Sequence, residues 1–486
     1  MEHGLRRVLI AVSGGLILAA ASINPTVAAP MEPQGETTVI QGYTTDPRYV
    51  GNPGAVLDAL ERGVSPEELG AGKAGQRHEL PRTEAEARRM RENSGQSYAV
   101  EADDYRPGVE VQEDPHNFET CLKNRDKATA PGGWVRSHFA WCQAGTAWAQ
   151  VSPPGGGLAR VEADIYLVGY GKQGPVPGSS TDRYLEFQMR AHEWRFRGIG
   201  SGARLWETHP EAQLDMRIEC IPTDDSDWDS CEDGDRNGRN DTIQNWLSSG
   251  WAEAQLVSEA KTPRKGHGQQ IQRATVYGKF VFSIPGFETD PDQSTSGSTS
   301  IRFDSAWYIT GTAGAKKQGS IFESVDPFLA YSNAADSGYK KVADHIAKAL
   351  NDPGSTMPPR SDKKIPGGAA TFPNHRLAPS VSSDHRKRYR ANRYDKGLAC
   401  DAHFEDWKDE VDDDGAEKEC DEFPFASTYE GAARARPEYS GGNDYVNWFS
   451  VQPLSRTQNG LAGRILGKWY NDDRILDSDA FHIKVR

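Results

Sequence analysis

Alternation of apolar and polar residues between positions 160 and 309 is the feature that most limits what this chain can fold into. The segments that show it are Arg160–Tyr170, Tyr184–Phe196, Gln213–Cys220, Ala274–Ile284 and Ser300–Ile309. Successive side chains of a strand point to opposite faces, so a two-residue period rich in aromatic and β-branched residues predicts half-buried strands. We therefore expect residues 116–332 to form an all-β domain, a sandwich or a barrel-like sheet, whose role the sequence does not indicate.

The N-terminus carries the features of an export signal. Arg6 and Arg7 precede an apolar stretch at 8–21, and small residues occupy 27–29. This order predicts a secretory signal peptide over residues 1–29 that is cleaved after Ala29. The alternative is an uncleaved anchor helix, which Gly14-Gly15 disfavours by interrupting the apolar run. We expect a secreted, extracellular protein with no stable membrane span after cleavage.

Export makes the cysteines informative, because disulfides persist in oxidising compartments. The chain has six: Cys121, Cys142, Cys220, Cys231, Cys400 and Cys420. Six cysteines allow about 15 pairings, and the sequence does not choose among them. Their spacing groups them as 121–142, 220–231 and 400–420, each closing a short loop. A zinc site is the weaker alternative, since the chain has no CxxC pair.

Residues 30–115 are rich in Gly, Pro, Glu and Arg and poor in large apolar side chains. Two short segments, Ala55–Arg62 and Thr83–Asn93, have a helical composition. Neither offers enough apolar surface to fold alone. We expect a mostly disordered leader or a wall-spanning stalk here.

A run of acidic and amide residues inside the β domain nearly fits a calcium-binding loop. Asp233, Asp235, Asn237 and Asp241 place oxygen ligands around a glycine. The twelfth position is Gln244 in place of the bidentate Glu, and no flanking helices are evident. We favour a solvated turn over a weak Ca²⁺ site, which stays as the alternative.

Charge is distributed unevenly along the chain. With 56 Lys and Arg against 70 Asp and Glu, the net charge of −14 excludes a bulk electrostatic attraction to nucleic acid, so any such site must be local. The C-terminal third has an acidic block at 401–422 beside a basic helix predicted over Asp384–Asp395. A second helix is predicted over Ala335–Leu350, and short strands, including Ile475–Val485, end the chain.

The segment around Glu422 has the residues of a cation site. Cys420-Asp-Glu precedes Pro424, and proline suits the first turn of a helix. We expect a helix to begin at Pro424, with the Glu422 carboxylate beside it. An oxygen ligand fixed in this way suits a hard divalent cation.

These residues resemble a known family. Cys420-Asp-Glu-Phe-Pro-Phe-Ala, followed by Glu430-Gly431, is similar to the core motif of the NucA/NucB-type secreted deoxyribonucleases. Weaker matches extend the resemblance over about residues 335–486: Tyr339–Leu350, His375-Arg376-Leu377, Ala391-Asn392-Arg393, and Gln458-Asn459-Gly460, where the family has a turn. The resemblance implies a small α+β domain over residues 333–486 with a ββα-metal nuclease core.

The resemblance also implies roles for individual residues. Glu422 would hold a hydrated Mg²⁺ or Mn²⁺, and His375 would be the general base that activates water. Imidazole titrates near neutrality and suits proton abstraction. Asp384 is the second candidate for the base.

Further residues would act around that centre. Arg376, Arg390 and Arg393 would contact phosphate groups, because guanidinium matches phosphate geometry, and Arg376 would also belong to the catalytic set. Glu430 and Asn459 would orient the metal shell or the helix.

The sequence thus predicts a multidomain protein whose C-terminal domain is a secreted, metal-dependent DNA endonuclease. Binding through phosphates alone would make cleavage independent of sequence. Two alternatives stay open. One is a non-enzymatic extracellular protein that binds glycan or cell wall and carries a degenerate nuclease fold. The other is a nuclease toxin, for which an immunity protein would be a partner.

Overall fold

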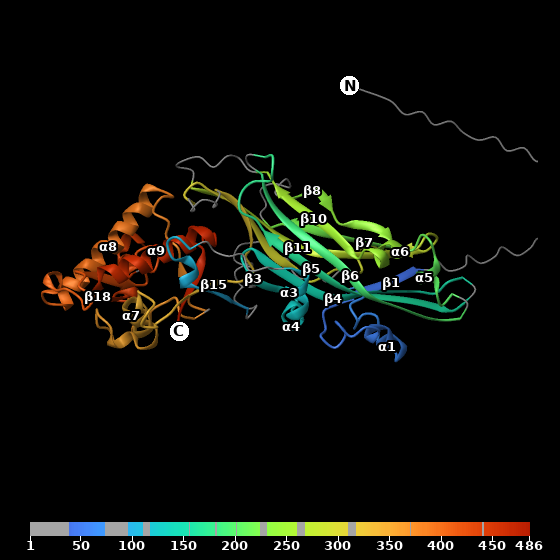
Figure 1. The fold of residues 1–486 in the computed structure, drawn as a ribbon, viewed down its shortest axis with the longest axis horizontal. Coiled ribbons are helices and arrows are strands. Elements are labelled where there is room, and N and C mark those ends of the chain that lie inside the picture. Colours follow the sequence, from blue (N-terminus) through green and yellow to red (C-terminus); the bar gives the residue numbers. More distant parts are fainter. Residues whose placement is uncertain are drawn as a thin grey trace, which may run out of the picture. The chain divides into compact units, whose positions relative to one another are not determined.

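Two largely antiparallel sheets form the β domain (Figure 1). The structure is a computed structural model that describes residues 38–72, 96–109, 117–154, 156–179, 182–200, 202–223, 231–259, 268–309, 317–369, 371–439 and 442–486.

The strand order of the larger sheet is β12 (Glu288–Thr289), β1 (Thr38–Thr44), β4 (Ala140–Val151), β5 (Leu158–Gly171), β6 (Arg183–Ile199), β10 (Trp251–Ser258) and β8 (Glu232–Asn237), with β3 (Trp134–Ser137) paired to β4. The order of the smaller sheet is β14 (Gln318–Phe322), β13 (Thr299–Ala306), β11 (Gln269–Ser283), β7 (Gln213–Pro222) and β9 (Arg239–Thr242).

One hydrophobic core joins the two sheets. Ile165 and Phe187 of the larger sheet and Met216 and Phe280 of the smaller sheet are all buried in it. The β-rich architecture predicted from the alternating segments is confirmed, since β5, β6, β7, β11 and β13 cover them. The last strand is shorter than expected and ends at Ala306.

The described part of residues 30–115 is folded, so the expectation of a disordered leader is wrong there. Strand β1 pairs with β4 over five residue pairs. The helix expected at 55–62 is present as α1 (Ala55–Glu61), whose apolar side chains pack around Trp148. This segment lacks the apolar surface to fold alone, but the sheet provides the missing partner. The signal peptide and the helix predicted at 83–93 lie outside the described residues.

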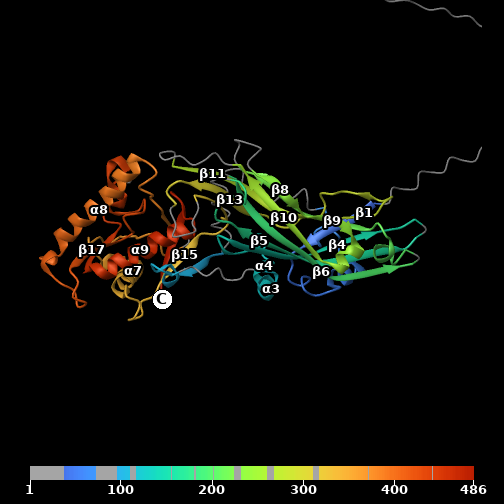
Figure 2. The ribbon, with the colours of Figure 1, turned by 45° about the horizontal axis from the view of Figure 1, so that its top comes forward.

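The C-terminal region combines three helices with two small sheets. The helices are α7 (Lys340–Asn351), α8 (Ser383–His403) and α9 (Arg456–Asp472). A four-stranded sheet has the order β16 (Asn374–His375), β19 (Ala480–Val485), β15 (Pro327–Tyr331) and β2 (Tyr98–Glu101), and a two-stranded ribbon pairs β17 (Lys418–Phe423) with β18 (Ser450–Ser455). The helices gather around β17 (Figure 2). The predicted helices at 335–350 and 384–395 are thus present, and α8 is longer than expected.

Two local predictions in this region are wrong. No helix begins at Pro424, because Cys420–Phe423 belong to β17, which pairs with β18, and turns follow. The turn expected around Asn459 lies inside α9. In both places the pairing and packing of the whole region override a local preference.

The sheet of the C-terminal region includes strands from beyond 333–486. Strand β15 pairs in parallel with β19, and β2 pairs in parallel with β15. Both strands precede the boundary that we expected at residue 333. The region therefore depends on residues that the sequence assigned to the leader and to the β domain. Within the described ranges, no helix has both the length and the apolar composition needed to span a bilayer.

Candidate functional site

A cavity of about 460 Å³ lies in the C-terminal region. Its lining residues come from α8 (Tyr389, Arg393, Lys396), β17 (Glu419, Asp421, Glu422), α9 (Asn459, Gly460, Gly463, Leu466, Gly467, Tyr470) and the segments between them (Pro379, Phe425, Ala426, Ser427). The cavity brings together three residues predicted from the sequence: Glu422, Asn459 and Arg393.

Glu422 is the buried acid of this cavity and is only 5% exposed. Its Oε1 lies 3.5 Å from Nζ of Lys396, whereas its Oε2 is buried and has no hydrogen-bond partner among the described residues. Burial raises the pKa of Glu422 to about 7, and the nearby ammonium of Lys396 opposes this shift. A buried carboxylate oxygen without a donor is costly unless another group binds it.

A hydrated divalent cation fits this carboxylate. Mg²⁺ keeps several of its water ligands and is commonly held by only one or two carboxylates. Glu422 of β17 and Asn459 of α9, which both line the cavity, offer that kind of oxygen set. In the described part of the chain there is no group of three or more His, Cys, Asp or Glu side chains placed to hold a metal, so the residues fit only an ion that stays largely hydrated.

Asp421, the neighbour of Glu422, is fixed by a buried histidine. Nδ1 of His345 on α7 lies 2.6 Å from Oδ2 of Asp421, and its Nε2 lies 2.7 Å from Oγ of Ser450. All three residues are buried. This chain of contacts ties both strands of the ribbon to α7. His345 was not predicted from the sequence, although a histidine on the apolar face of a predicted helix was a signal that could have identified it.

His375 and Glu430 are also brought together, but neither lines the cavity. The Glu430 carboxylate accepts from the backbone N–H of His375 at 2.8 Å and contacts Nδ1 of its ring at 2.9 Å. With Nδ1–H donating, the free lone pair of the neutral ring is on Nε2. Asp384, the other candidate base, is exposed at the start of α8, and its hydrogen bond from Lys387 lowers its pKa.

The predicted arginines occupy two different environments. Arg376 is buried, donates to the carbonyl of Tyr470 at 3.2 Å and stacks over the rings of Tyr308 and Tyr470. It holds segments of the protein together, so the expected phosphate contact of Arg376 is not available. Arg390 and Arg393 are exposed on α8.

Three disulfides join the six cysteines in the pairs that their spacing suggested: Cys121–Cys142, Cys220–Cys231 and Cys400–Cys420. The third links α8 to β17, two residues before Glu422. It therefore fixes both walls of the cavity to each other.

The run considered for calcium forms strands. Asp233, Asp235 and Asn237 lie in β8, and Asp241 lies in β9, where its carboxylate binds Arg239 at 2.8 Å. Only Gly238, with φ of 77°, forms the turn between these strands. The two strands belong to different sheets, because β8 pairs with β10 of the larger sheet and β9 pairs with β7 of the smaller sheet.

Comparison with known proteins agrees with the motif at 420–431. The model of a family described as Deoxyribonuclease NucA/NucB matches residues 371–484. The match includes the cavity and every residue that we predicted for the site. No curated protein and no solved structure matches the chain. The resemblance predicted from the sequence is confirmed over residues 371–484, and it is the C-terminal region of this chain that is similar to the deoxyribonucleases of the NucA/NucB family, whereas Tyr339–Leu350 lies outside the match.

Proposed function

We propose that the C-terminal region is a metal-dependent deoxyribonuclease that hydrolyses DNA without sequence preference. The observation that carries the proposal is the buried, unpartnered Oε2 of Glu422 in a cavity that lies inside the family match. Three disulfides support a location outside the cell, where such bonds persist. We assign β17, β18 and α9, two antiparallel strands followed by a helix, to the ββα-metal nuclease core.

Mg²⁺ or Mn²⁺ is the ion we expect at Glu422, with Asn459 as a second oxygen donor. When bound, such an ion supplies Lewis-acid stabilisation of the charge that develops on a phosphate. Lys396 keeps a positive charge 3.5 Å from the same carboxylate. It thereby favours the ionised form of Glu422, which is the form that binds a cation.

His375 is our candidate for the general base. Glu430 holds its Nδ1 and its backbone, so the ring has one orientation and presents Nε2 as the proton acceptor. Asp384 is less suitable, because its side chain is 83% exposed and already paired with Lys387. Arg393 lines the cavity and is our candidate phosphate contact.

The decisive experiment is cleavage of plasmid DNA by the full mature chain in a series with Mg²⁺, Mn²⁺, Ca²⁺ and EDTA. We expect cleavage with Mg²⁺ or Mn²⁺ only, and Glu422→Gln should reduce the rate by about 100-fold or more while the protein stays folded. Glu417→Gln is the matched control, since Glu417 pairs with Arg456 at an exposed position. It should cleave like the wild type.

The same assay tests the nuclease activity, the site at Glu422 and the identity of the general base separately. An absence of cleavage in every metal contradicts the nuclease and favours a non-enzymatic binding protein. Full activity of Glu422→Gln contradicts the site but leaves the activity intact. His375→Ala should lower the rate by about 10²-fold to 10⁴-fold, whereas Asp384→Ala should not; the reverse result transfers the role of base to Asp384.

A further inference from the structure

Helix α8 carries a row of exposed arginines that ends at the cavity. Arg386, Arg390 and Arg393 follow one another at steps of four and three residues, so they share one face of the helix. No hydrogen bond or ion pair joins any of them to another residue in the described parts of the chain. Neighbouring cations differ: Lys387 binds Asp384 at 2.9 Å, and Arg388 donates to the carbonyl of Tyr429 at 2.6 Å.

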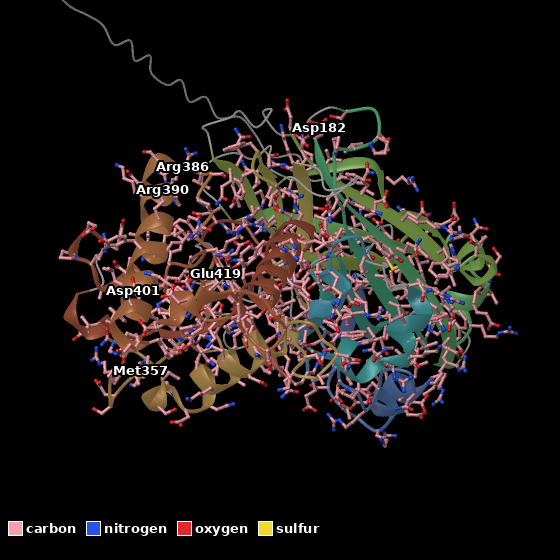
Figure 3. The ribbon with its side chains drawn as sticks, turned by 60° about the vertical axis from the view of Figure 1, so that its left-hand side comes forward. Asp182, Met357, Arg386, Arg390, Asp401 and Glu419 are labelled. Atoms are coloured by element: carbon pink, nitrogen blue, oxygen red, sulfur yellow. A yellow bond between two sulfur atoms is a disulfide. The ribbon has the colours of Figure 1, made fainter. Side chains whose placement is uncertain are left out.

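The length of this row matches a short piece of nucleic acid. At about 1.5 Å per residue, Arg386 and Arg393 are separated by about 10 Å along the helix axis. One DNA strand carries a phosphate about every 3.4 Å of duplex axis, and the direct distance between successive phosphates is longer than this axial rise, so the row spans about two to three phosphates. Figure 3 shows Arg386 and Arg390 near one end of α8 and Asp401 toward the other. Arg393 is the member that lines the cavity.

The opposite wall of the cavity is formed by the glycine face of α9, which consists of Gly460, Gly463 and Gly467. Glycine in a helix interior costs about 1 kcal/mol relative to alanine. A Cβ added at Gly463 or at Gly467 would meet no atom within 4 Å, so packing does not require glycine at either position. What these two glycines leave open is space in the cavity that also contains the unpartnered oxygen of Glu422.

We infer that one strand of DNA lies in the groove between α8 and α9, with successive phosphates along the three arginines and its sugars against the glycine face. The inference rests on the proposed function and adds the path of the strand. Guanidinium groups bind phosphates without reading sequence. A wall of bare helix backbone lets the strand approach Glu422 closely.

The arginine row is tested by binding alone. Fluorescence anisotropy of a labelled single-stranded oligonucleotide with the full chain in EDTA reports affinity without turnover. The triple variant Arg386→Ala/Arg390→Ala/Arg393→Ala should weaken binding and reduce the slope of log affinity against log salt by about 2, at about 0.7 per phosphate contact. The control is Lys387→Ala, which removes a paired charge from another face and should keep the wild-type slope. An unchanged slope in the triple variant overturns the arginine path.

The glycine face is tested by two effects measured together, a gain in stability and a loss of DNA binding and cleavage. A purely structural role of these glycines would not produce both. Gly463→Ala and Gly467→Ala should each raise the midpoint of thermal unfolding by about 1–4 °C and lower both oligonucleotide affinity and the cleavage rate by about tenfold. Gly397→Ala on α8 is the matched control, because a Cβ there also meets no atom within 4 Å and Gly397 does not line the cavity. It should gain the same stability with unchanged binding. Wild-type affinity and cleavage in both α9 variants overturn the inference.

The outcomes separate this inference from the proposed function. A wild type that binds DNA through the arginines but cleaves it in no metal supports the path and contradicts the nuclease. A wild type that cleaves, with variants that bind and cleave equally well, keeps the nuclease and overturns the path.

Discussion

Asp304 on β13 and Arg474, which follows α9, form an ion pair in which both side chains are fully buried. Nε of Arg474 lies 3.1 Å from Oδ1 of Asp304. On the same strand, Arg302 binds Asp479 at 2.8 Å, and the backbone N–H of Arg376 donates to the Asp479 carbonyl. The smaller sheet of the β domain therefore holds the turn between α9 and β19. Through these contacts it positions the region that contains the cavity.

Removing one partner of this pair should destabilise the whole protein. Asp304→Ala leaves a buried guanidinium without its counter-charge, and we expect the free energy of unfolding to fall by about 3–5 kcal/mol. Urea unfolding of the full chain measures this change. Asp292→Ala is the control, because Asp292 pairs with Lys279 while 73% exposed, and it should cost less than about 1 kcal/mol. Equal losses in the two variants contradict the role assigned to the buried pair.

The C-terminal region should not fold as residues 333–486 alone. That fragment lacks β15, which pairs with β19, and β2, which pairs with β15. It also exposes Arg474 and Asp479 without their partners from β13. We expect no cooperative unfolding transition of the fragment by circular dichroism and no DNA cleavage, whereas the full chain shows both. A fragment that unfolds cooperatively at the midpoint of the full chain contradicts this prediction.

The Cys400–Cys420 disulfide should matter for both stability and cleavage. It closes a loop over a sequence separation of 20 residues and joins α8 to β17. Replacing both cysteines by serine should lower the free energy of unfolding by about 3 kcal/mol through loop entropy and should also loosen the cavity, so cleavage slows. The matched control replaces Cys220 and Cys231, separated by 11 residues and distant in sequence from the cavity, and should cost similar stability with the cleavage rate unchanged. Equal cleavage rates in the two double variants count against the positioning role.

Local patterns in the sequence predicted the elements whose residues alternate or recur within one segment. Strands β5 and β6 and helices α7 and α8 were found in this way. Strand β15 was not separated from the β domain, because all its residues are buried and its partner β19 is far away in sequence. Long-range pairing also explains why no helix begins at Pro424. Strand β18 pairs with β17 as far as Phe423, so the residue before Pro424 belongs to a strand.

The residues of the candidate site were also predicted only where a local sequence motif identified them. The motif around Glu422 found the acid of the cavity, and Asn459 and Arg393 lie in it too. Composition does not distinguish an arginine that binds phosphate from one that is buried, so the burial of Arg376 could not be foreseen from the sequence. His345 was missed because its partner Asp421 is 76 residues away.

A buried carboxylate in the β domain should make stability depend on pH. Burial raises the pKa of Asp164 to about 6, and hydrogen bonds from Thr146 and from the backbone of Gly51 oppose this shift. The ordinary value for Asp is about 3.9, so the folded state keeps a proton that the unfolded state has released between about pH 4 and pH 6. This contribution favours folding below about pH 4 and is lost as the pH rises through about 6. It amounts to at most about 3 kcal/mol.

Urea unfolding at a series of pH values tests this dependence. In Asp164→Asn the carboxyl is absent, so from pH 4 to pH 6 the free energy of unfolding of the wild type should fall relative to that of the variant. Asp126→Asn removes an exposed carboxyl on α4 (Arg125–Ala128) and is the control, which should follow the wild type. The comparison uses slopes and not absolute stabilities, because asparagine also replaces one acceptor oxygen by a donor. If Asp164→Asn and the wild type have parallel pH profiles, then Asp164 is ionised in the folded state across this range.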